Sequence, residues 1–487
     1  MTAPPAMDVE EFRRLGHKAV DLVSDYLAGV ASRPVFTPMT PGERQSLLDE
    51  DWPRTGCPAE ALIEAVAAKV LPHAMGNGHP RFFGWVNSPP APIGVIGDFL
   101  ASALNPSCAG GDHAAVYIER AAIRWLMELL GYPADGSMGL LVSGGSVANL
   151  IGLAAARHRA SAEMGSNVRA EGLHGVRRRL LLYMTAEGHS CVRKAVELMG
   201  LGTDSIRTVP IDRDFRMDVP ALEAAVARDR AAGLLPFAVV ASAGTVSTGA
   251  IDPLARIADV AERERLWLHV DGAYGGVGIT APGRAERYKG LDRADSLALD
   301  PHKWLSVPIE CGCAFVRDGA LLRDAFSYVP AYLRTEEGKG FGGPTWFSEY
   351  GIQQTRGFRA LKLWLVLQHM GRQGIAALVS RHIGLAERLA AAVDRAPDLE
   401  RLAPAELSIV CFRFTPPGRA LDGEGLDALN KRIMETIQSE GRAFLSNATL
   451  GGRFALRACI LHYGTVEADV DALVDLVRET GTRLLNE

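Results

Sequence analysis

The sequence predicts an α/β protein built on a largely parallel sheet. The first observation is that short apolar segments alternate with helical segments between residues 91 and 375 of the 487-residue chain. The second is that each apolar segment ends in glycine or polar residues before the next helix begins. Strands that alternate with helices are typical of parallel sheets whose faces are covered. The segments that carry this pattern include GLLVSGG, LLLYMTAEGHS, FAVVASAGTVSTG, LWLHVDGAYGG and SLALDPHKW.

The regions on either side of this alternation have different patterns. Residues 8–30 place apolar side chains at helical spacing, and Asp8 with Glu11 predicts an N-terminal cap. This helix is amphipathic, so its apolar face needs a partner. A second helix-and-strand pattern follows the alternation. We therefore expect an N-terminal helical arm over residues 1–90, a large α/β domain over 91–375 and a small α+β domain over 376–487.

Composition narrows the class of protein. A net charge of −5 gives no reason to expect nucleic acid as a partner. The N-terminus lacks the pattern of a signal peptide, and no apolar run reaches ~18 residues, so we expect a cytoplasmic protein with no membrane partner. The seven scattered cysteines fit a reducing compartment. Cys311 and Cys313 form an isolated C-x-C, which we interpret as small buried side chains, with no metal site.

Polar side chains follow successive predicted strands at the points where the strands end. In open parallel sheets the ligand binds at the carboxyl ends of the strands. Each of these residues alone is explained by a cap or a turn, but together they predict one site. The residues are Ser143–Ser146, His189, Thr245, Asp271 and His302–Lys303.

Asp271 and Lys303 predict the chemistry of this site. Asp271 ends one apolar strand, and Lys303 follows 32 residues later at the end of another. A carboxylate there could cap a helix, or it could hold the protonated ring nitrogen of a cofactor. A lysine whose pKa is lowered by burial or by nearby cations forms a Schiff base with an aldehyde. Pyridoxal 5'-phosphate requires both partners, so we expect it as the cofactor.

Two further motifs agree with a cofactor that carries a phosphate and an aromatic ring. SGGSVANL, residues 143–150, places a glycine turn before a helix, where backbone N–H groups suit a phosphate. It is equally compatible with a tight turn capped by Ser146, and it matches neither the P-loop nor the serine-hydrolase elbow. His189 could stack on a ring or face solvent in its turn.

Taken together, the motifs resemble the pyridoxal-phosphate-dependent group II amino-acid decarboxylases, of the aromatic-L-amino-acid decarboxylase kind. The resemblance covers nearly the whole chain and implies fold type I, with a mainly parallel seven-stranded sheet. It also implies a homodimer with the active site at the interface and the N-terminal arm swapped onto the partner. The matching motifs are HPRFFGW, SGGSVANL, EGHSCVRKA, LWLHVDGAYGG, DPHKWL and RGFRALKLW.

The resemblance also implies roles for individual residues. Lys303 would bond to the cofactor, Asp271 would hold its ring nitrogen and His189 would stack on the ring. Tyr332, in the loop YVPAYLRTEEGKGFGG, would protonate the substrate carbon after CO2 leaves, which favours simple decarboxylation. The remaining implied cofactor-binding residues are Gly145, Ser146, Thr245, Ala273 and His302.

The sequence departs from the family pattern at two positions. Asp300 stands where relatives often have an asparagine that reaches the phosphate, and a carboxylate there would repel a phosphate unless a proton or cation intervened. Val246 stands where animal relatives carry threonine, so we select Thr245, although Thr248 could serve instead.

The substrate is predicted from an apolar stretch before the sheet. Phe83, Trp85 and Val86 offer an apolar wall, and we expect Trp85, Val86 and Ser88 to bind the substrate. This favours decarboxylation of an aromatic L-amino acid, such as tryptophan, tyrosine or dihydroxyphenylalanine. Arg457 leaves glutamate, aspartate or cysteine sulfinate open. The same residues are also compatible with an aminotransferase, an aldehyde-forming enzyme or a binding protein without catalysis.

Overall fold

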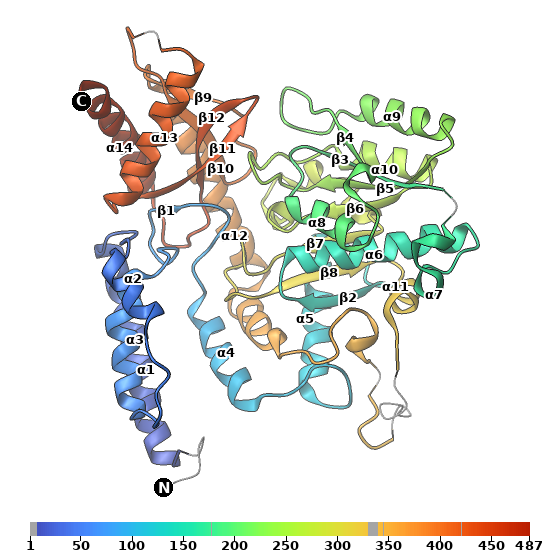
Figure 1. The fold of residues 1–487 in the computed structure, drawn as a ribbon, viewed down its shortest axis with the longest axis horizontal. Coiled ribbons are helices and arrows are strands. Elements are labelled where there is room, and N and C mark those ends of the chain that lie inside the picture. Colours follow the sequence, from blue (N-terminus) through green and yellow to red (C-terminus); the bar gives the residue numbers. More distant parts are fainter. Residues whose placement is uncertain (1–6, 177, 330–338, 344, 420) are drawn as a thin grey trace. The chain divides into compact units, whose positions relative to one another are not determined.

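The computed structural model describes residues 7–176, 178–329, 339–343, 345–419 and 421–487. The chain divides into two compact units (Figure 1). The large unit contains Val86–Ala390 and Leu402–Cys411. The small unit contains Met1–Trp85, Ala391–Arg401 and Phe412–Glu487.

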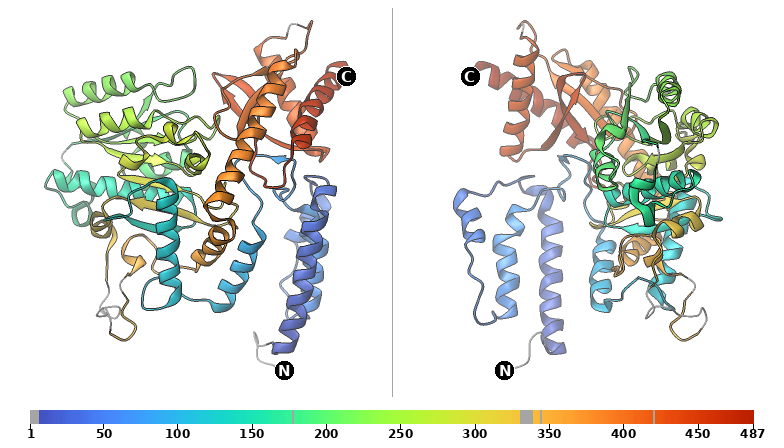
Figure 2. Two further views of the ribbon diagram at one scale, coloured as in Figure 1. Left: turned by 180° about the vertical axis from the view of Figure 1, so that it is seen from behind. Right: turned by 45° about the vertical axis from the view of Figure 1, so that its right-hand side comes forward.

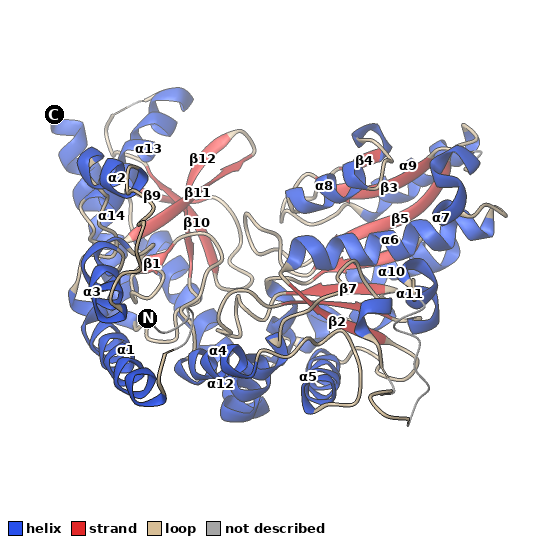
Figure 3. Ribbon diagram, turned by 60° about the horizontal axis from the view of Figure 1, so that its bottom comes forward, coloured by secondary structure: helices blue, strands red, loops and turns tan. Residues whose placement is uncertain are grey.

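The large unit is organised around a seven-stranded sheet, with strand order β2-β8-β7-β6-β5-β3-β4 (Figure 3). Only β8 runs antiparallel to its neighbours, so the predicted mainly parallel α/β sheet is confirmed. Apart from β4 at the edge of the sheet, the strands are largely apolar and almost entirely buried, as expected where helices cover both faces. Their bounds are β2 Met138–Val142, β3 Leu180–Thr185, β4 Ile206–Val209, β5 Leu235–Ser242, β6 Trp267–Asp271, β7 Ser296–Leu299 and β8 Gly312–Val316.

The strand register aligns the carboxyl ends of the central strands. Ser242 at the end of β5 is the register partner of Asp271, and Asp271 is the partner of Ala298 in β7. The residues that follow β7 therefore continue along the same edge of the sheet as Asp271. This edge is where the predicted site residues were expected to meet.

Helices pack against both faces of this sheet. The chain passes from β2 through α6 to β3 in one direction along the sheet, and from β4 through α9 to β5 in the other, so right-handed crossovers place α6 and α9 on opposite faces. α6 packs across β5 to β8 beside α8, while α10 packs beside α9. The helices are α4 Pro92–Leu104, α5 Ala114–Leu130, α6 Gly145–Glu163, α7 Val168–Glu171, α8 Ser190–Leu198, α9 Val219–Ala231, α10 Leu254–Arg263 and α11 Gly319–Phe326.

α12, Arg359–Arg395, contributes residues to both units. Its regular geometry is interrupted at Gly371, which has a φ of 61°, a conformation that glycine adopts at little cost. The domain boundary that we predict at residue 375 lies within this element. The boundaries at residues 90 and 375 stay predictions.

The small unit carries a five-stranded sheet with the order β1-β11-β12-β10-β9. α13 packs on β11 and β12, with α14 beside it. The strands are β1 Phe82–Phe83, β9 Leu399–Arg401, β10 Ile409–Phe414, β11 Phe444–Leu450 and β12 Arg453–Cys459, and β10 begins within the large unit. The helices are α1 Val9–Gly29, α2 Pro41–Leu48, α3 Ala59–Lys69, α13 Gly423–Ser439 and α14 Glu467–Asn486.

α1 begins where the sequence predicts. Asp8 caps it, accepting a hydrogen bond from the Glu11 backbone N–H at 2.8 Å. α1 lies beside α3 (Figure 2), and the Lys18 ammonium lies 2.8 Å from the carboxylates of both Glu60 and Glu64. Its apolar side chains are largely exposed, with Phe12 at 52%. Within the described residues, no helix has the length and apolar character needed to span a membrane.

Candidate active site

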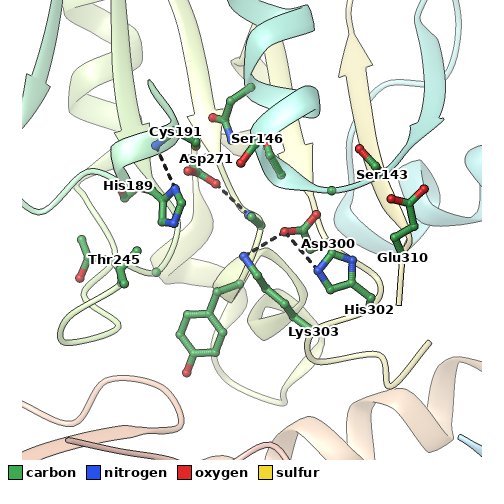
Figure 4. Close-up of a pocket in the computed structure, with 18 of the residues that line it drawn as sticks. Ser143, Ser146, His189, Cys191, Thr245, Asp271, Asp300, His302, Lys303 and Glu310 are labelled. Atoms are coloured by element: carbon green, nitrogen blue, oxygen red, sulfur yellow. Dashed lines mark hydrogen bonds and ion pairs between the residues drawn. The ribbon is translucent and has the colours of Figure 1, made fainter. Parts of the chain in front are cut away.

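The carboxyl edge of the large sheet opens into a cavity of ≈450 Å³ (Figure 4). Its lining residues come from the segments that follow β2, β3, β5, β6 and β7, and all of them belong to the large unit. The structure therefore brings together all of the cofactor-binding residues that the sequence predicts. These are Gly145, Ser146, His189, Thr245, Asp271, Ala273, His302 and Lys303.

Lys303 is held in the cavity by the residue that follows it. The Trp304 ring stacks on Tyr274, with 5.1 Å between ring centroids, and its indole N–H donates to His382 Nδ1 at 3.0 Å. The Lys303 backbone N–H donates to the Asp300 carbonyl at 2.9 Å. These contacts fix the backbone around Lys303 while its ammonium points into the cavity.

The pKa of Lys303 is shifted in the opposite direction from the one that the sequence predicts. Burial does lower its pKa, but the carboxylates of Asp300 and Asp271 more than offset this, so the pKa lies above its ordinary value. The Lys303 ammonium lies 2.9 Å from Asp300 Oδ2. The amine is therefore charged until another group replaces this pairing. The sequence did not indicate that two carboxylates would face it.

Asp271 and His189 are both fixed by backbone hydrogen bonds. Asp271 Oδ1 accepts from the Ala273 N–H at 3.1 Å. His189 is the N-cap of α8, and its Nδ1 accepts from the Cys191 N–H at 3.1 Å. Burial lowers the pKa of His189, partly offset by the Asp271 charge. Because Nδ1 is an acceptor, the neutral ring carries its proton on Nε2.

The N-terminus of α6 forms an anion-binding cradle at the cavity wall. Its N-cap is Gly144, which supplies no side-chain hydrogen bond to the first-turn N–H groups. A Cβ at Gly145 would lie 2.8 Å from Asp300 Oδ2, so no side chain fits there. His302 lies beside it, with its Nδ1 2.8 Å from the Cys311 carbonyl oxygen and 3.2 Å from the Cys311 backbone nitrogen. Backbone N–H groups at a helix start suit a phosphate, so the cavity residues fit pyridoxal phosphate.

A buried chain of hydrogen bonds, which the sequence did not indicate, ends at the Gly145 carbonyl and supports this cradle. The Trp267 indole N–H donates to Ser296 Oγ at 2.7 Å, and that hydroxyl donates to His269 Nδ1 at 2.7 Å. His269 Nε2–H then donates to Asn149 Oδ1 at 2.7 Å. The Asn149 amide donates in turn to the Gly145 carbonyl at 2.7 Å. Because the Gly145 carbonyl can only accept, Asn149 turns its oxygen toward His269, so the neutral His269 ring donates from Nε2 and accepts at Nδ1.

The predicted threonine lines the cavity in a tight turn. Thr245 is buried and shares a 3.0 Å hydrogen bond with Thr248. The cavity also contains two carboxylates that sequence reasoning missed, Glu187 and Glu310. Glu187 stands two residues before His189, so the motif around His189 carried a signal for it.

The predicted substrate-binding residues are not among the described residues that line this cavity, and their role stays a prediction. Val86 and Ser88 are not among the cavity-lining residues, and the Ser88 hydroxyl donates to the His302 carbonyl at 3.3 Å. Trp85 belongs to the small unit, where its carbonyl accepts from Arg457 at 2.9 Å. Tyr332 lies outside the described residues. Among those that are described, no cluster of histidine, cysteine and carboxylate side chains is arranged to hold a metal ion.

Comparison with known proteins identifies the family. Residues 41–415 match the pyridoxal-dependent decarboxylase conserved domain. The chain belongs to the pyridoxal-dependent decarboxylase family. This membership makes the protein a carboxy-lyase of fold type I with pyridoxal 5'-phosphate as cofactor, as the sequence motifs predict.

Relatives of this pyridoxal-dependent decarboxylase cover almost its full length. An aromatic-L-amino-acid decarboxylase of Bacillus atrophaeus is 34% identical over 466 residues, covering 95% of this chain and 94% of the relative. A crystal structure of Oryza sativa TDC with PLP and tryptamine has a TM-score of 0.92 and 30% identity, covering 99% of this chain and 100% of the other. The phenylacetaldehyde synthase of Arabidopsis thaliana is 29% identical over 490 residues, covering 99% of this chain and 98% of the relative.

Proposed function

We propose that this decarboxylase converts an aromatic L-amino acid to its amine and CO2. The observation that carries the proposal is the meeting of Lys303, Asp271 and His189 in one cavity beside the uncapped start of α6. Each of these groups has a use in pyridoxal phosphate chemistry, and the family is that of the decarboxylases.

The chain's own residues would divide the work as follows. When bound, pyridoxal phosphate supplies an electron sink that accepts the electron pair left by CO2. Lys303 would hold the cofactor through its amine and yield that place to the substrate. Asp271 would keep the proton on the cofactor's ring nitrogen, and His189 would cover the ring. Gly145, Ser146 and His302 would bind the phosphate, with Thr245 and Ala273 completing the site.

Two groups could return a proton to the substrate carbon. His189 carries its proton on Nε2, because Nδ1 is occupied by the Cys191 N–H. Tyr332 is the second, and we propose it for this step from the resemblance to the family. Tyr332→Phe should shift the products from amine toward aldehyde.

The charge of the cavity supports a substrate without an acidic side chain. Four carboxylates line it, and Lys303 is the one lysine or arginine among the described lining residues. A second carboxylate on the substrate would meet like charge, and the described lining residues include no arginine to pair with it. Relatives are named as aromatic-L-amino-acid, tryptophan and tyrosine decarboxylases. The lining carboxylates are Glu187, Asp271, Asp300 and Glu310.

We propose that Trp85, Val86 and Ser88 contact the substrate ring.

We further propose that the enzyme acts as a homodimer with its active site at the interface. The support is the exposed apolar side of α1, which includes Phe12, Val20 and Val23. If the arm formed by residues 1–90 is swapped onto the partner subunit, this apolar side of α1 would be buried against the partner. A cytoplasmic location, predicted from composition, belongs to the same proposal.

The experiment that tests the proposal is a substrate panel scored by two products. Purified enzyme with pyridoxal phosphate is given tryptophan, tyrosine, dihydroxyphenylalanine, glutamate, aspartate or cysteine sulfinate, and both CO2 and amine are measured. We expect equal amounts of CO2 and amine from an aromatic substrate. Lys303→Ala should abolish turnover, whereas Lys289→Ala, at an exposed lysine, should not. Aldehyde and ammonia in place of amine, or faster turnover of an acidic substrate, would refute the proposal.

A further inference from the structure

Asp300 is the least explained residue of the cavity. It follows β7, its side chain is only 3% exposed, and its Oδ2 lies 2.9 Å from the Lys303 ammonium. Its other oxygen, Oδ1, is buried and has no hydrogen-bond partner among the described residues. A buried carboxylate oxygen without a partner is costly, so the side chain is incompletely satisfied in this state.

The same carboxylate faces the cradle at the start of α6. A Cβ at Gly145 would lie 2.8 Å from Asp300 Oδ2, and a Cβ at Gly144 would lie 3.9 Å from Oδ1. Backbone N–H groups and the helix dipole favour an anion at this place. An anion bound by the first turn of α6 would therefore lie close to the Asp300 carboxylate, which is also negatively charged.

Of the charged groups around Asp300, Lys303 is the one within hydrogen-bond distance among the described residues. His302 Nε2 is 3.9 Å from Oδ2, and burial lowers the pKa of His302. Lys362 on α12 is paired with Asp98 at 3.1 Å. The other titratable groups that face this part of the cavity are Asp271 on β6, His189 and Cys191 at the start of α8, and Cys311 before β8.

We propose that Asp300 takes up a proton when pyridoxal phosphate binds and shares it with the phosphate. The inference rests on the proposed function, because it assumes that Lys303 leaves Asp300 to bond with the cofactor. Asp300 then loses its close counter-ion at the moment when a phosphate arrives at the neighbouring cradle. Two anions this close in a buried site do not both stay fully charged, so one proton is held by the pair.

The proton balance of this step is simple. The Lys303 nitrogen bonds to the aldehyde carbon, the aldehyde oxygen leaves as water with two of the ammonium hydrogens, and the nitrogen keeps one proton and its positive charge. The charge on the lysine nitrogen is therefore unchanged. The proton on the Asp300–phosphate pair comes from solvent, so binding of the cofactor consumes a proton.

The test measures proton uptake and cofactor affinity, independently of turnover. Calorimetric titration of the cofactor-free protein with pyridoxal phosphate at pH 8, in buffers of different ionisation enthalpy, counts the protons bound. We expect the wild type to take up about one proton more than Asp300→Asn. As the pH rises, the dissociation constant of pyridoxal phosphate should increase more steeply for the wild type than for Asp300→Asn, by an additional factor of about ten per pH unit. Asp300→Asn should therefore bind the cofactor more tightly than the wild type at high pH. Glu310→Gln removes another carboxylate of the cavity and should behave as the wild type.

A second measurement needs no variant. Pyridoxal, which lacks the phosphate, should bind to the wild type without the additional proton, and this comparison decides the question if Asp300→Asn fails to fold. Equal proton uptake for the wild type and Asp300→Asn, or for pyridoxal and pyridoxal phosphate, overturns this inference while the proposed function stands. A wild type that does not bind pyridoxal phosphate overturns both.

Discussion

Acid should destabilise this protein through a histidine that takes no part in the proposed chemistry. His269 is fully buried between Ser296 and Asn149, and burial lowers its pKa to about 4 from an ordinary value of 6.5, despite the opposing effect of Asp271. The unfolded chain therefore binds a proton near pH 6.5, whereas the folded chain binds it only near pH 4. Stability is lost as the pH falls through this window.

The size of the effect follows from the two pKa values. With 6.5 in the unfolded chain and about 4 in the folded one, the contribution of His269 alone should fall by about 2 kcal/mol of unfolding free energy between pH 7.5 and pH 5. Most of this loss should disappear in His269→Gln, because glutamine can donate to Asn149 but does not titrate. At neutral pH the variant should itself be less stable by about 1 kcal/mol, since one hydrogen bond of the chain is altered.

The assay is urea unfolding of the cofactor-free protein at pH 7.5 and pH 5. The quantity compared is the change in unfolding free energy between the two pH values for the wild type and the variant. His174→Gln, the same substitution at an exposed histidine of the large unit, should lose as much stability as the wild type. A variant at His269 that loses stability in parallel with the wild type would refute the reasoning.

Two other contacts give predictions of the same kind. Asn149→Ala removes the amide that donates to the Gly145 carbonyl, so the cradle loses its support, and we expect the dissociation constant of pyridoxal phosphate to rise about tenfold in an equilibrium binding assay. Arg356→Met leaves the fully buried Glu119 carboxylate without its cation, which should lower the unfolding free energy by about 3–5 kcal/mol in urea. An unchanged affinity of Asn149→Ala would contradict the first prediction, and a loss of less than about 1 kcal/mol of unfolding free energy in Arg356→Met would contradict the second.

Several features of the fold follow from short stretches of sequence. The alternation of apolar and helical segments predicts a mainly parallel sheet, because hydrophobic periodicity depends on neighbouring residues alone. Asp8 predicts the cap of α1 for the same local reason. The position of Lys303 and Asp271 at strand ends placed both on one edge of the sheet before their register was known.

Other features depend on contacts between distant parts of the chain. His269 and Asn149 are 120 residues apart, and only the packing of α6 on β6 joins them. The close approach of Asp300 to Gly145 has the same origin. The raised pKa of Lys303 was missed because the sequence does not say which charges surround a buried amine.

The sequence alone therefore determined the family, the cofactor and the residues that meet at the strand ends. Motifs such as HVDGAYGG and DPHKWL carry the chemistry in short stretches whose meaning does not depend on the rest of the fold. Only the tertiary structure decided the electrostatics of the site. The charge state of a buried group depends on its distances to all of its neighbours, and these are set by strand register and helix packing.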